Sequence, residues 1–379
     1  MTKHDYKQNA YYLMYLIRCV LNNRTPAKEK LGKMDLSGVF AVAKAHSLTA
    51  IAAYALESAG IYDKDFEEEK NKAIRKTIIL DAERENVFAE FEKAGIWYMP
   101  LKGIIIKDLY PQIGMRQMGD NDILIDNTRQ KDIKEIMLSN GFRVESYNIS
   151  KHDVYYKDPV SNFQMHVSLF DKNEKDPRYC YFKEIEKRII SDSNSNYGRA
   201  FTDEDFYLYI KAHEYKHYST GGTGIRSIVD TYMILTHFMN KLNMQYIETE
   251  CEKLGIAEYE KQSRELAMHL LGGVKLTAGE CEMFDYIIFS GTYGTFENVI
   301  NNKVNKSGDF YFAKLKYIKS RLFVAIRKSD PKYKAYSTRY KWFYANRVRL
   351  PLLFFYRLGL ALTSRQSRAK AEIKALRKI

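Results

Sequence analysis

The chain has 379 residues, of which 45% are hydrophobic and 28% are charged, and it is rich in tyrosine and phenylalanine. This composition is typical of a globular protein and excludes an intrinsically disordered chain. The few cysteines lie far apart and form no CxxC pair, which argues against a disulfide scaffold and favours a reducing compartment. We therefore expect a cytoplasmic protein. The cysteines are Cys19, Cys180, Cys251 and Cys281.

The net charge of +13 is unevenly distributed along the chain. Residues 303–379 contain 21 lysines and arginines but only Asp309, Asp330 and Glu372 as acids, so this region has a net charge of +18. The rest of the chain therefore carries −5. The high isoelectric point is a property of the C-terminal fifth, and any anionic partner is expected there.

The first part of the chain has the apolar spacing of amphipathic helices over residues 6–22, 36–59 and 66–94. The last of these predicted helices has acidic residues at its start and Gly95 where a helix C-cap belongs. We expect this helix to end at Gly95.

A mixed pattern of strands and helices follows, over about residues 95–170. IWYMP, NDILID, FRVESY, DVYYKD and NFQMHVSLF are predicted strands, and the helices are predicted from LKGIIIKDLY and TRQKDIKEIMLSNGF. After Thr202 the pattern is helical again. The sequence thus predicts an α+β chain with a small mixed-sheet core inserted between helical N- and C-terminal regions, with boundaries at 1–94, 95–200, 201–302 and 303–379.

Two aspartates open the predicted strand NDILID. Because strand side chains alternate between faces, Asp120 and Asp122 are expected on one side, opposite Ile123 and Ile125. Two adjacent carboxylates repel each other unless a cation lies between them, and Mg²⁺ prefers such oxygen ligands. Taken alone, the pair has an equally good explanation as turn chemistry or an edge charge.

The residues upstream of the aspartates suit a phosphate. Lys102 and Gly103 lie where a short strand turns into a helix, so the backbone N–H groups of the turn, together with the Lys102 charge, are expected to bind phosphate oxygens. Arg116, four residues before Asp120, is expected to reach a triphosphate.

At these residues the chain resembles the nucleotidyltransferases of the DNA polymerase β-like superfamily, and more narrowly a bacterial group labelled uncharacterised nucleotidyltransferase. The resemblance rests on LKG, LYP, RQM and DNDILID, on FQMHVSLF, and on HEYKH followed by GGTGIRSIVDTY. It covers roughly residues 95–235, and the order of the blocks is more specific than any one motif.

The resemblance implies that an NMP moves from an NTP to an acceptor with the help of two Mg²⁺ ions. It implies that Asp120 and Asp122 are the metal ligands and that Lys102 and Gly103 form the phosphate turn, although the superfamily more often has Gly-Ser or Gly-Gly there. By the same resemblance, His213, His217, Arg226 and Asp230 would line the nucleotide pocket. ATP is the default donor, and the acceptor would be a small molecule, a glycan intermediate, a protein or an RNA end.

One position departs from the superfamily pattern. The third carboxylate of the resemblance falls on Gln164, whose amide cannot act as a general base and contributes only a neutral oxygen to a metal. Three explanations stand: an engineered inactivating change, a natural protein that binds without turnover, or an acid from elsewhere, such as Asp153 or Asp171. The intact surroundings narrowly favour the first. His166, two residues on, is expected near the metal or phosphate, or is a structural histidine.

Two further stretches allow other functions. HEYKH fits the H-E-x-x-H pattern, in which His213 and His217 would bind Zn²⁺ and Glu214 would act as the base of a peptidase, with Glu248 a candidate third acidic ligand. This pattern leaves DNDILID unexplained, and the histidines also suit packing between helices.

The basic region 303–379 interleaves arginines and lysines with aromatic residues, which suits RNA, an anionic membrane surface or a helical cap equally well. Its apolar run LPLLFFY is too short to span a bilayer, so we expect at most a peripheral position at a membrane.

Overall fold

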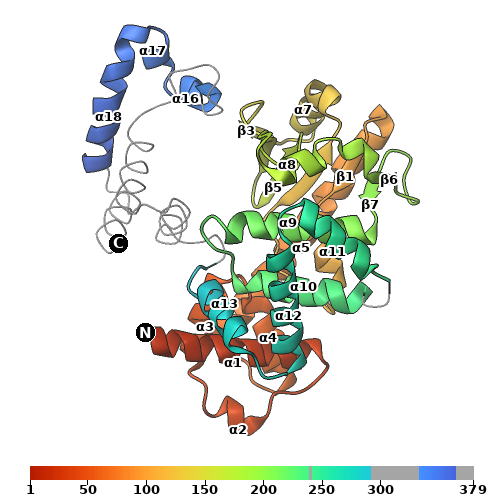
Figure 1. Cartoon of the computed structure of the whole chain (residues 1–379), viewed down its shortest axis with the longest axis vertical. Helices are drawn as coiled ribbons and strands as arrows, with labels where there is room; N and C mark the ends of the chain where they lie inside the picture. The colour runs from red at the N-terminus through yellow and green to blue at the C-terminus, as the bar shows by residue number, and fades with distance from the viewer. Residues whose placement is uncertain (239–240, 292–332, 364–379) are drawn as a thin grey trace. The chain divides into compact units, whose positions relative to one another are not determined.

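The computed structural model of the chain describes residues 1–238, 241–291 and 333–363 (Figure 1). The chain forms two compact units. The first comprises Met1–Tyr215 and Gly224–Thr292, and the second comprises Lys216–Thr223 and Tyr293–Ile379. Part of the predicted basic region, residues 303–332 and 364–379, lies outside the described residues.

The first unit opens with helices whose ends follow the capping signals of the sequence. Thr2 and Asp5 form a capping box at the start of the first helix. Asp63 caps the long helix α5, which ends as predicted at Gly95, whose φ of +65° is the left-handed conformation that favours glycine. The helices are α1 (Lys3–Leu21), α2 (Lys28–Leu31), α3 (Leu36–Ala45), α4 (Thr49–Ser58) and α5 (Lys64–Ala94).

The stretch with a helical pattern over residues 36–59 forms two helices. α3 ends at Ala45 and α4 begins at Thr49. The residues between them leave the helical conformation, with Ser47 at a φ of +55°. Apolar residues at helical spacing continue on both sides of this break, so the hydrophobic pattern alone does not reveal it.

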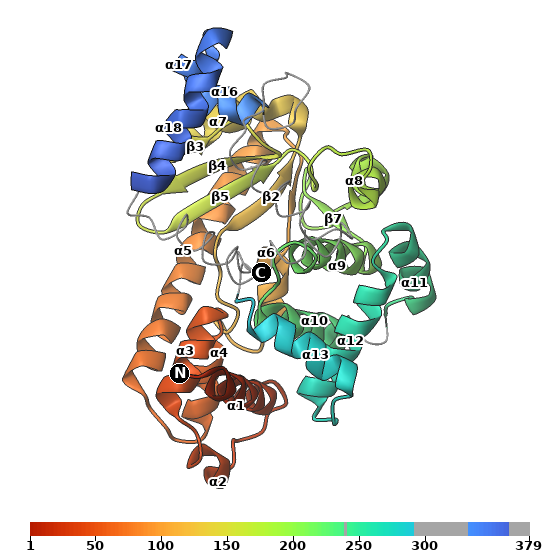
Figure 2. The ribbon, with the colours of Figure 1, turned by 60° about the vertical axis from the view of Figure 1, so that its left-hand side comes forward.

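All five predicted strands are present and form one mixed sheet. Figure 2 shows β2, β5, β4 and β3 of this sheet side by side. The strand order is β1-β2-β5-β4-β3, in which β2 and β5 are parallel and the other neighbours are antiparallel. The mixed sheet between helical flanks confirms the predicted α+β class. The strands are β1 (Tyr98–Pro100), β2 (Asn121–Ile125), β3 (Arg143–Ser146), β4 (His152–Lys157) and β5 (Ser161–His166).

One face of the sheet is covered by α5 and by α7 (Gln130–Ser139), and this layer forms the core of the sheet region. Alternate residues of β2 and β5 point into it, among them Ile123, Ile125, Phe163 and Met165, which are 0–1% exposed. Burial of these side chains fixes the register of both strands, because a slip by one residue would turn each apolar side chain to the other face.

Short elements connect the strands and extend the sheet region. The connection from β1 to β2 contains α6 (Gly103–Ile106) and the 3₁₀ turn η1 (Lys107–Leu109), and η2 (Asn127–Arg129) precedes α7. A two-stranded sheet of β6 (Ile189–Ser191) and β7 (Arg199–Phe201) follows α8 (Pro177–Phe182) and η3 (Ile185–Lys187). The sequence pattern did not predict these last four elements.

Helices return after the sheets, as predicted: α9 (Asp203–Tyr218), α10 (Ile225–Phe238), α11 (Met244–Lys253), α12 (Ala257–Gly272) and α13 (Ala278–Ile288). α12 and α13 pack against α1, so the helices before and after the sheet join in one body. His46 ties them together. Its Nδ1 accepts the Ile225 N–H (3.1 Å), and its Nε2–H donates to the Ile288 carbonyl (3.1 Å).

The second unit contains α16 (Tyr333–Arg339), α17 (Lys341–Tyr344), η4 (Arg347–Arg349) and α18 (Leu350–Thr363). Within the described ranges, no helix has both the length and the apolar character needed to cross a membrane.

Candidate active site

The opening of β2 directs its side chains to two faces of the sheet. Asp122 pairs in register with Gln164 of β5 and lies on the face away from α5 and α7, as does Asp120, whose carboxylate contacts Gln164. Asn121, between them, points the other way and is fully buried. The two aspartates therefore lie on the same side, and Ile123 and Ile125 lie opposite them, as the alternation predicts.

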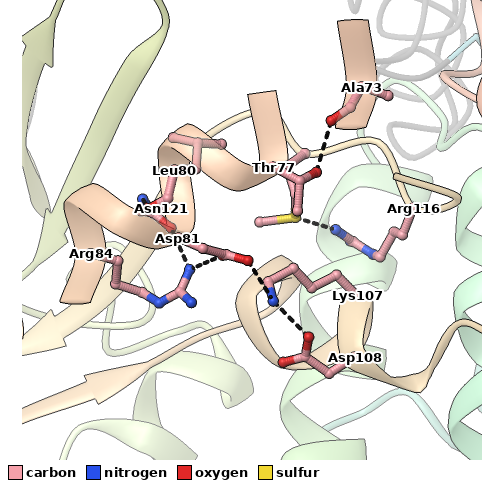
Figure 3. Close-up of polar contacts among 10 residues, drawn as sticks. Ala73, Thr77, Leu80, Asp81, Arg84, Lys107, Asp108, Arg116 and Asn121 are labelled. Carbon is pink, nitrogen blue, oxygen red and sulfur yellow. Dashed lines mark hydrogen bonds and ion pairs between the residues drawn. The ribbon is translucent and has the colours of Figure 1, made fainter. Parts of the chain in front are cut away.

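Asn121 anchors the beginning of the strand to the long helix (Figure 3). Its amide donates to the Leu80 carbonyl of α5 (3.0 Å), and its oxygen accepts from Arg84 (3.3 Å). Arg84 also pairs with Asp81 (2.5 Å), and Asp81 pairs with Lys107 of η1 (3.1 Å). This network fixes the start of β2 and the segment before it to α5, and so positions the two aspartates.

Gln164 lies beside both aspartates. It is the parallel-strand partner of Asp122, and its Nε2 donates to Asp120 Oδ2 at 2.5 Å. Position 164 is thus placed where a third carboxylate would complete a cluster of acids, and in this chain it carries a neutral amide that donates to one of them.

Asp122 is held by two donors. Lys102 Nζ and His166 Nε2 lie 2.8 and 2.6 Å from Asp122 Oδ1. Burial acts to raise the pKa of Asp122, but the nearby Lys102 charge and the His166 hydrogen bond outweigh it and lower that pKa. Burial lowers the pKa of His166 to about 4 despite Asp122, so at neutral pH its ring is uncharged and carries its proton on Nε2.

At Asp120 the effects that raise the pKa outweigh those that lower it. Burial first, and then repulsion by Asp122, raises the pKa of Asp120 to about 6, against the opposing effect of Lys102, Arg226 and Lys76. Lys76 of α5 donates to the Gly119 carbonyl (2.8 Å), next to Asp120. Sequence reasoning missed Lys76, because on α5 it looks like one of many solvated helix charges.

The turn before α6 has unusual backbone geometry. Lys102 has a φ of +48°, a left-handed conformation that a side chain rarely adopts, and it precedes the first residue of α6. From this turn the Lys102 ammonium reaches Asp122. At Gly103 a Cβ atom would lie 2.6 Å from Arg116 Nη1, so this position has no room for a side chain.

Arg116 is buried and bound to Asp230 of α10. Its Nε and Nη2 donate to the two carboxylate oxygens, each at 2.9 Å, and Tyr110 donates to Asp230 Oδ1 (2.7 Å). Arg116, which was expected to reach the triphosphate, therefore pairs with Asp230, which the resemblance assigns to the nucleotide pocket. Arg226, one turn before Asp230 on the same helix, donates to the Gln117 carbonyl (3.3 Å) and is close enough to Asp120 to lower its pKa.

The geometry of HEYKH does not resemble that of a zinc peptidase. Glu214 is buried, and it accepts from Lys211 (2.7 Å) and Thr231 (3.4 Å). A carboxylate neutralised in this way is not placed to activate water. The His213 ring packs near Tyr209, with centroids 6.2 Å apart.

Of the two substitute acids proposed from the sequence, Asp153 does not reach the site. It pairs in register with Met165, whose side chain lies in the core on the α7 side, and it accepts from Gln130 of α7 (3.2 Å). The prediction that Asp153 supplies the third carboxylate is therefore wrong, because strand alternation puts it on the opposite face. Asp171 is exposed and close enough to His152 for its charge to act on the His152 pKa.

Two aromatic side chains that the sequence did not single out lie on the site face. His152 is the strand partner of His166, with ring centroids 5.1 Å apart. Tyr209 of α9 is fully buried. Its burial raises the pKa of Tyr209, and the nearby Asp122 charge raises that pKa further. Both residues come from segments remote from DNDILID in the sequence, so only the fold could reveal them.

The donor set suits a Mg²⁺ ion that takes much of its shell from water and phosphate. In the part of the chain that the structure describes, no three His, Cys, Asp or Glu side chains form a metal cluster. The two carboxylates of Asp120 and Asp122 and the amide of Gln164 are nevertheless hard oxygen ligands, and one or two carboxylates are the usual protein contribution to a Mg²⁺ site. Asp120 keeps a raised pKa, through burial and repulsion by Asp122, although Lys102, Arg226 and Lys76 act to lower it.

Comparison with known proteins gives one match. Residues 32–272 match the model of a family described as uncharacterised nucleotidyltransferase. No curated protein and no solved structure matches the chain. The matched segment spans more than half of the chain and contains the whole mixed sheet, the aspartate pair and α10. The chain therefore belongs to the uncharacterised nucleotidyltransferase family.

Proposed function

We propose that this protein is a Mg²⁺-dependent nucleotidyltransferase that moves an NMP from an NTP to an acceptor. One observation carries the proposal: Asp120 and Asp122 lie together on one face of the sheet, with position 164 of the parallel neighbour strand beside them. Membership of a nucleotidyltransferase family supports the reaction class.

The residues around the pair suit this role. Asp120 and Asp122 would hold Mg²⁺, which when bound supplies positive charge to the phosphates of the NTP. Lys102 lies 2.8 Å from Asp122, and Arg226 and Lys76 act electrostatically on Asp120. A polyphosphate beside the aspartates would therefore meet three cationic side chains in addition to the metal.

Gln164 reduces what this site can do. A neutral amide in place of a carboxylate weakens metal binding and leaves no general base at that position. We infer that the chain binds the nucleotide with Mg²⁺ and turns it over slowly or not at all. In the extreme case the protein is a nucleotide-binding member of the family whose transfer chemistry has been lost.

Calorimetric titration with ATP, CTP, GTP and UTP, each with and without Mg²⁺, tests the proposal without knowledge of the acceptor. We expect saturable binding of at least one NTP that requires Mg²⁺. Replacing Asp120 and Asp122 together by Asn removes the charge that holds the cation and should abolish the Mg²⁺-dependent part of the binding.

Asp65→Asn is the matched control, because Asp65 is exposed on the first turn of α5, far from the site in the sequence and without a role there. This variant should bind like the unmodified protein. Undiminished Mg²⁺-dependent binding in the Asp120/Asp122 double variant would refute the metal assignment, and no binding of any NTP to the unmodified protein would refute the function.

A further inference from the structure

Residues 333–363 of the second unit carry only positive charges. Residues 333–363 contain six basic residues and no acidic residue. Such a segment attracts anionic partners and repels a second copy of itself. The basic residues are Lys334, Arg339, Lys341, Arg347, Arg349 and Arg357.

Large apolar side chains of the same segment are exposed. On α18, Leu352 is 53% exposed, Phe355 65% and Tyr356 49%. Their spacing of three and four residues puts them on one face of the helix. Val348 of η4 is 80% exposed, and Trp342 of α17 is 57% exposed. The Phe343 ring of α17 lies 5.2 Å from the Tyr356 ring, which brings α17 beside this side of α18. We call the five exposed residues the apolar face.

The apolar face is separate from the side of α18 that packs. Leu353 is fully buried, and Leu350, on the side of the helix opposite the apolar face, is 9% exposed. The Arg357 guanidinium lies over the Tyr336 ring of α16, 5.2 Å from its centroid. α18 thus already has a packed side, and the exposed face is a second apolar surface that this packing does not use.

Basic groups border the apolar face. The Arg349 guanidinium lies over the Trp342 ring at 4.5 Å and donates to the Trp342 carbonyl (3.4 Å), and Lys341, next in sequence, is exposed. Arg339 lies over the Tyr340 ring at 5.7 Å. Tryptophan and tyrosine beside cationic side chains are the combination found where proteins meet the headgroup region of a bilayer.

We propose that the apolar face docks on an anionic lipid surface, with Leu352 and Phe355 entering the boundary between headgroups and acyl chains and Lys341 and Arg349 contacting lipid phosphates. The exposed Leu and Val side chains favour lipid over nucleic acid, because they have no π face on which a base could stack. The absence of any acid in residues 333–363 disfavours a second copy, since two such faces would repel. The helix lies on the surface and does not span it.

Co-flotation of the full chain with vesicles tests the proposal and does not depend on nucleotide binding. We expect binding to phosphatidylcholine vesicles that contain phosphatidylglycerol, and much weaker binding to pure phosphatidylcholine. Phe355→Ser should lower the partition coefficient roughly tenfold or more, the effect of losing one buried aromatic side chain. Lys341→Glu should lower it by at least about fivefold, because each basic residue near the surface contributes about that factor.

Val274→Ser and Lys28→Glu are the matched controls. Val274 is 55% exposed and Lys28 is also exposed, both in the first unit, and neither should change vesicle binding. The proposal is wrong if Phe355→Ser and Lys341→Glu bind vesicles as well as the unmodified chain does. It is also wrong if the unmodified chain binds both vesicle types equally.

The fluorescence of Trp342 gives a second readout. The chain has two tryptophans, so Trp97→Phe leaves Trp342 as the only indole. Its emission should shift to the blue when anionic vesicles are added. An emission that does not shift when vesicles are added would refute the proposal. Single-stranded RNA would be the partner instead if it binds the chain, if Phe355→Ser weakens that binding, and if vesicles do not bind.

Discussion

Gln164 Nε2 donates to Asp120 Oδ2 at 2.5 Å, from the strand parallel to the one that carries Asp122. The amide therefore donates a hydrogen bond to Asp120, which an ionised carboxylate at position 164 could not do. A carboxylate there would add a third negative charge to a pair whose repulsion already raises the pKa of Asp120.

Gln164→Glu should therefore make the stability of the folded protein depend on Mg²⁺. Without Mg²⁺ we expect a lower melting temperature, because a hydrogen bond is lost and a like charge is added, at a cost of roughly 1–3 kcal/mol. Mg²⁺ should restore the melting temperature, since it binds the folded state and stabilises it by mass action. With an NTP and a broad set of acceptors, pyrophosphate release should rise.

The control for this variant is Gln245→Glu, the same change at an exposed position of α11. Its melting temperature should not respond to Mg²⁺. If Gln164→Glu is as stable as the unmodified protein in metal-free buffer and does not respond to Mg²⁺, position 164 is not part of a metal site.

Asn121→Ala should destabilise the protein by about 1–3 kcal/mol, because the hydrogen bonds that the buried Asn121 side chain makes with the Leu80 carbonyl and with Arg84 are both lost. Chemical denaturation measures the change. Asn71→Ala, at an exposed position of the same helix α5, should be neutral or slightly stabilising, since alanine is the better helix former. Equal effects of the two substitutions would contradict the anchoring role of Asn121.

His46 should make the protein less stable in mild acid. Burial lowers the pKa of His46 to about 4, from an ordinary value of 6.5 in the unfolded chain. Between these two values the unfolded state binds the proton first, so the free energy of unfolding falls as the pH falls from about 6.5 to about 4. The loss amounts to roughly 3 kcal/mol.

Gln is the informative replacement for His46, because its amide can still donate and accept but does not titrate. Denaturation curves of His46→Gln and of the unmodified protein should differ in their dependence on pH between about 4 and 6.5, and run parallel above that range. Parallel curves throughout would show that His46 titrates normally. Other groups that titrate in this range, such as Asp120, are common to both proteins and cancel in the difference.

Gly103→Ala should cost about 1–3 kcal/mol, because the new methyl group would lie 2.6 Å from Arg116 Nη1 and Arg116 is fixed by Asp230. Gly119→Ala is the matched control: an added Cβ there meets no atom within 4 Å. That substitution should be neutral or stabilising through the unfolded chain. Thermal unfolding of the two variants compares them, and equal stability would contradict the packing argument.

Much of the fold could be predicted because short sequence patterns determine where its strands and helices lie. Alternation placed Asp120 and Asp122 opposite Ile123 and Ile125, and the glycine after α5 marked the end of that helix. The break at Ser47 could not be predicted, since apolar spacing continues across it. Neither could β6 and β7, which are three residues long and too short to show a period.

The candidate site was predictable to the same extent. The carboxylates and Gln164 lie in strands whose pattern is readable, whereas the pairing of Arg116 with Asp230 joins residues 114 positions apart. Nothing in the local sequence distinguishes an arginine that binds a ligand from one that binds a distant aspartate. Lys76 and Tyr209 are further cases in which only the packing of helices onto the sheet places a side chain near the aspartates.

The contact of Gly103 with Arg116 has a consequence for evolution. The glycine of the LKG triplet is required by the packing of the protein itself, whether or not a phosphate ever binds there. A descendant that had stopped transferring nucleotides would still be under selection to keep this glycine in order to fold. The presence of the triplet therefore indicates a shared fold and not a present activity. Evidence of activity has to come from positions that folding does not constrain.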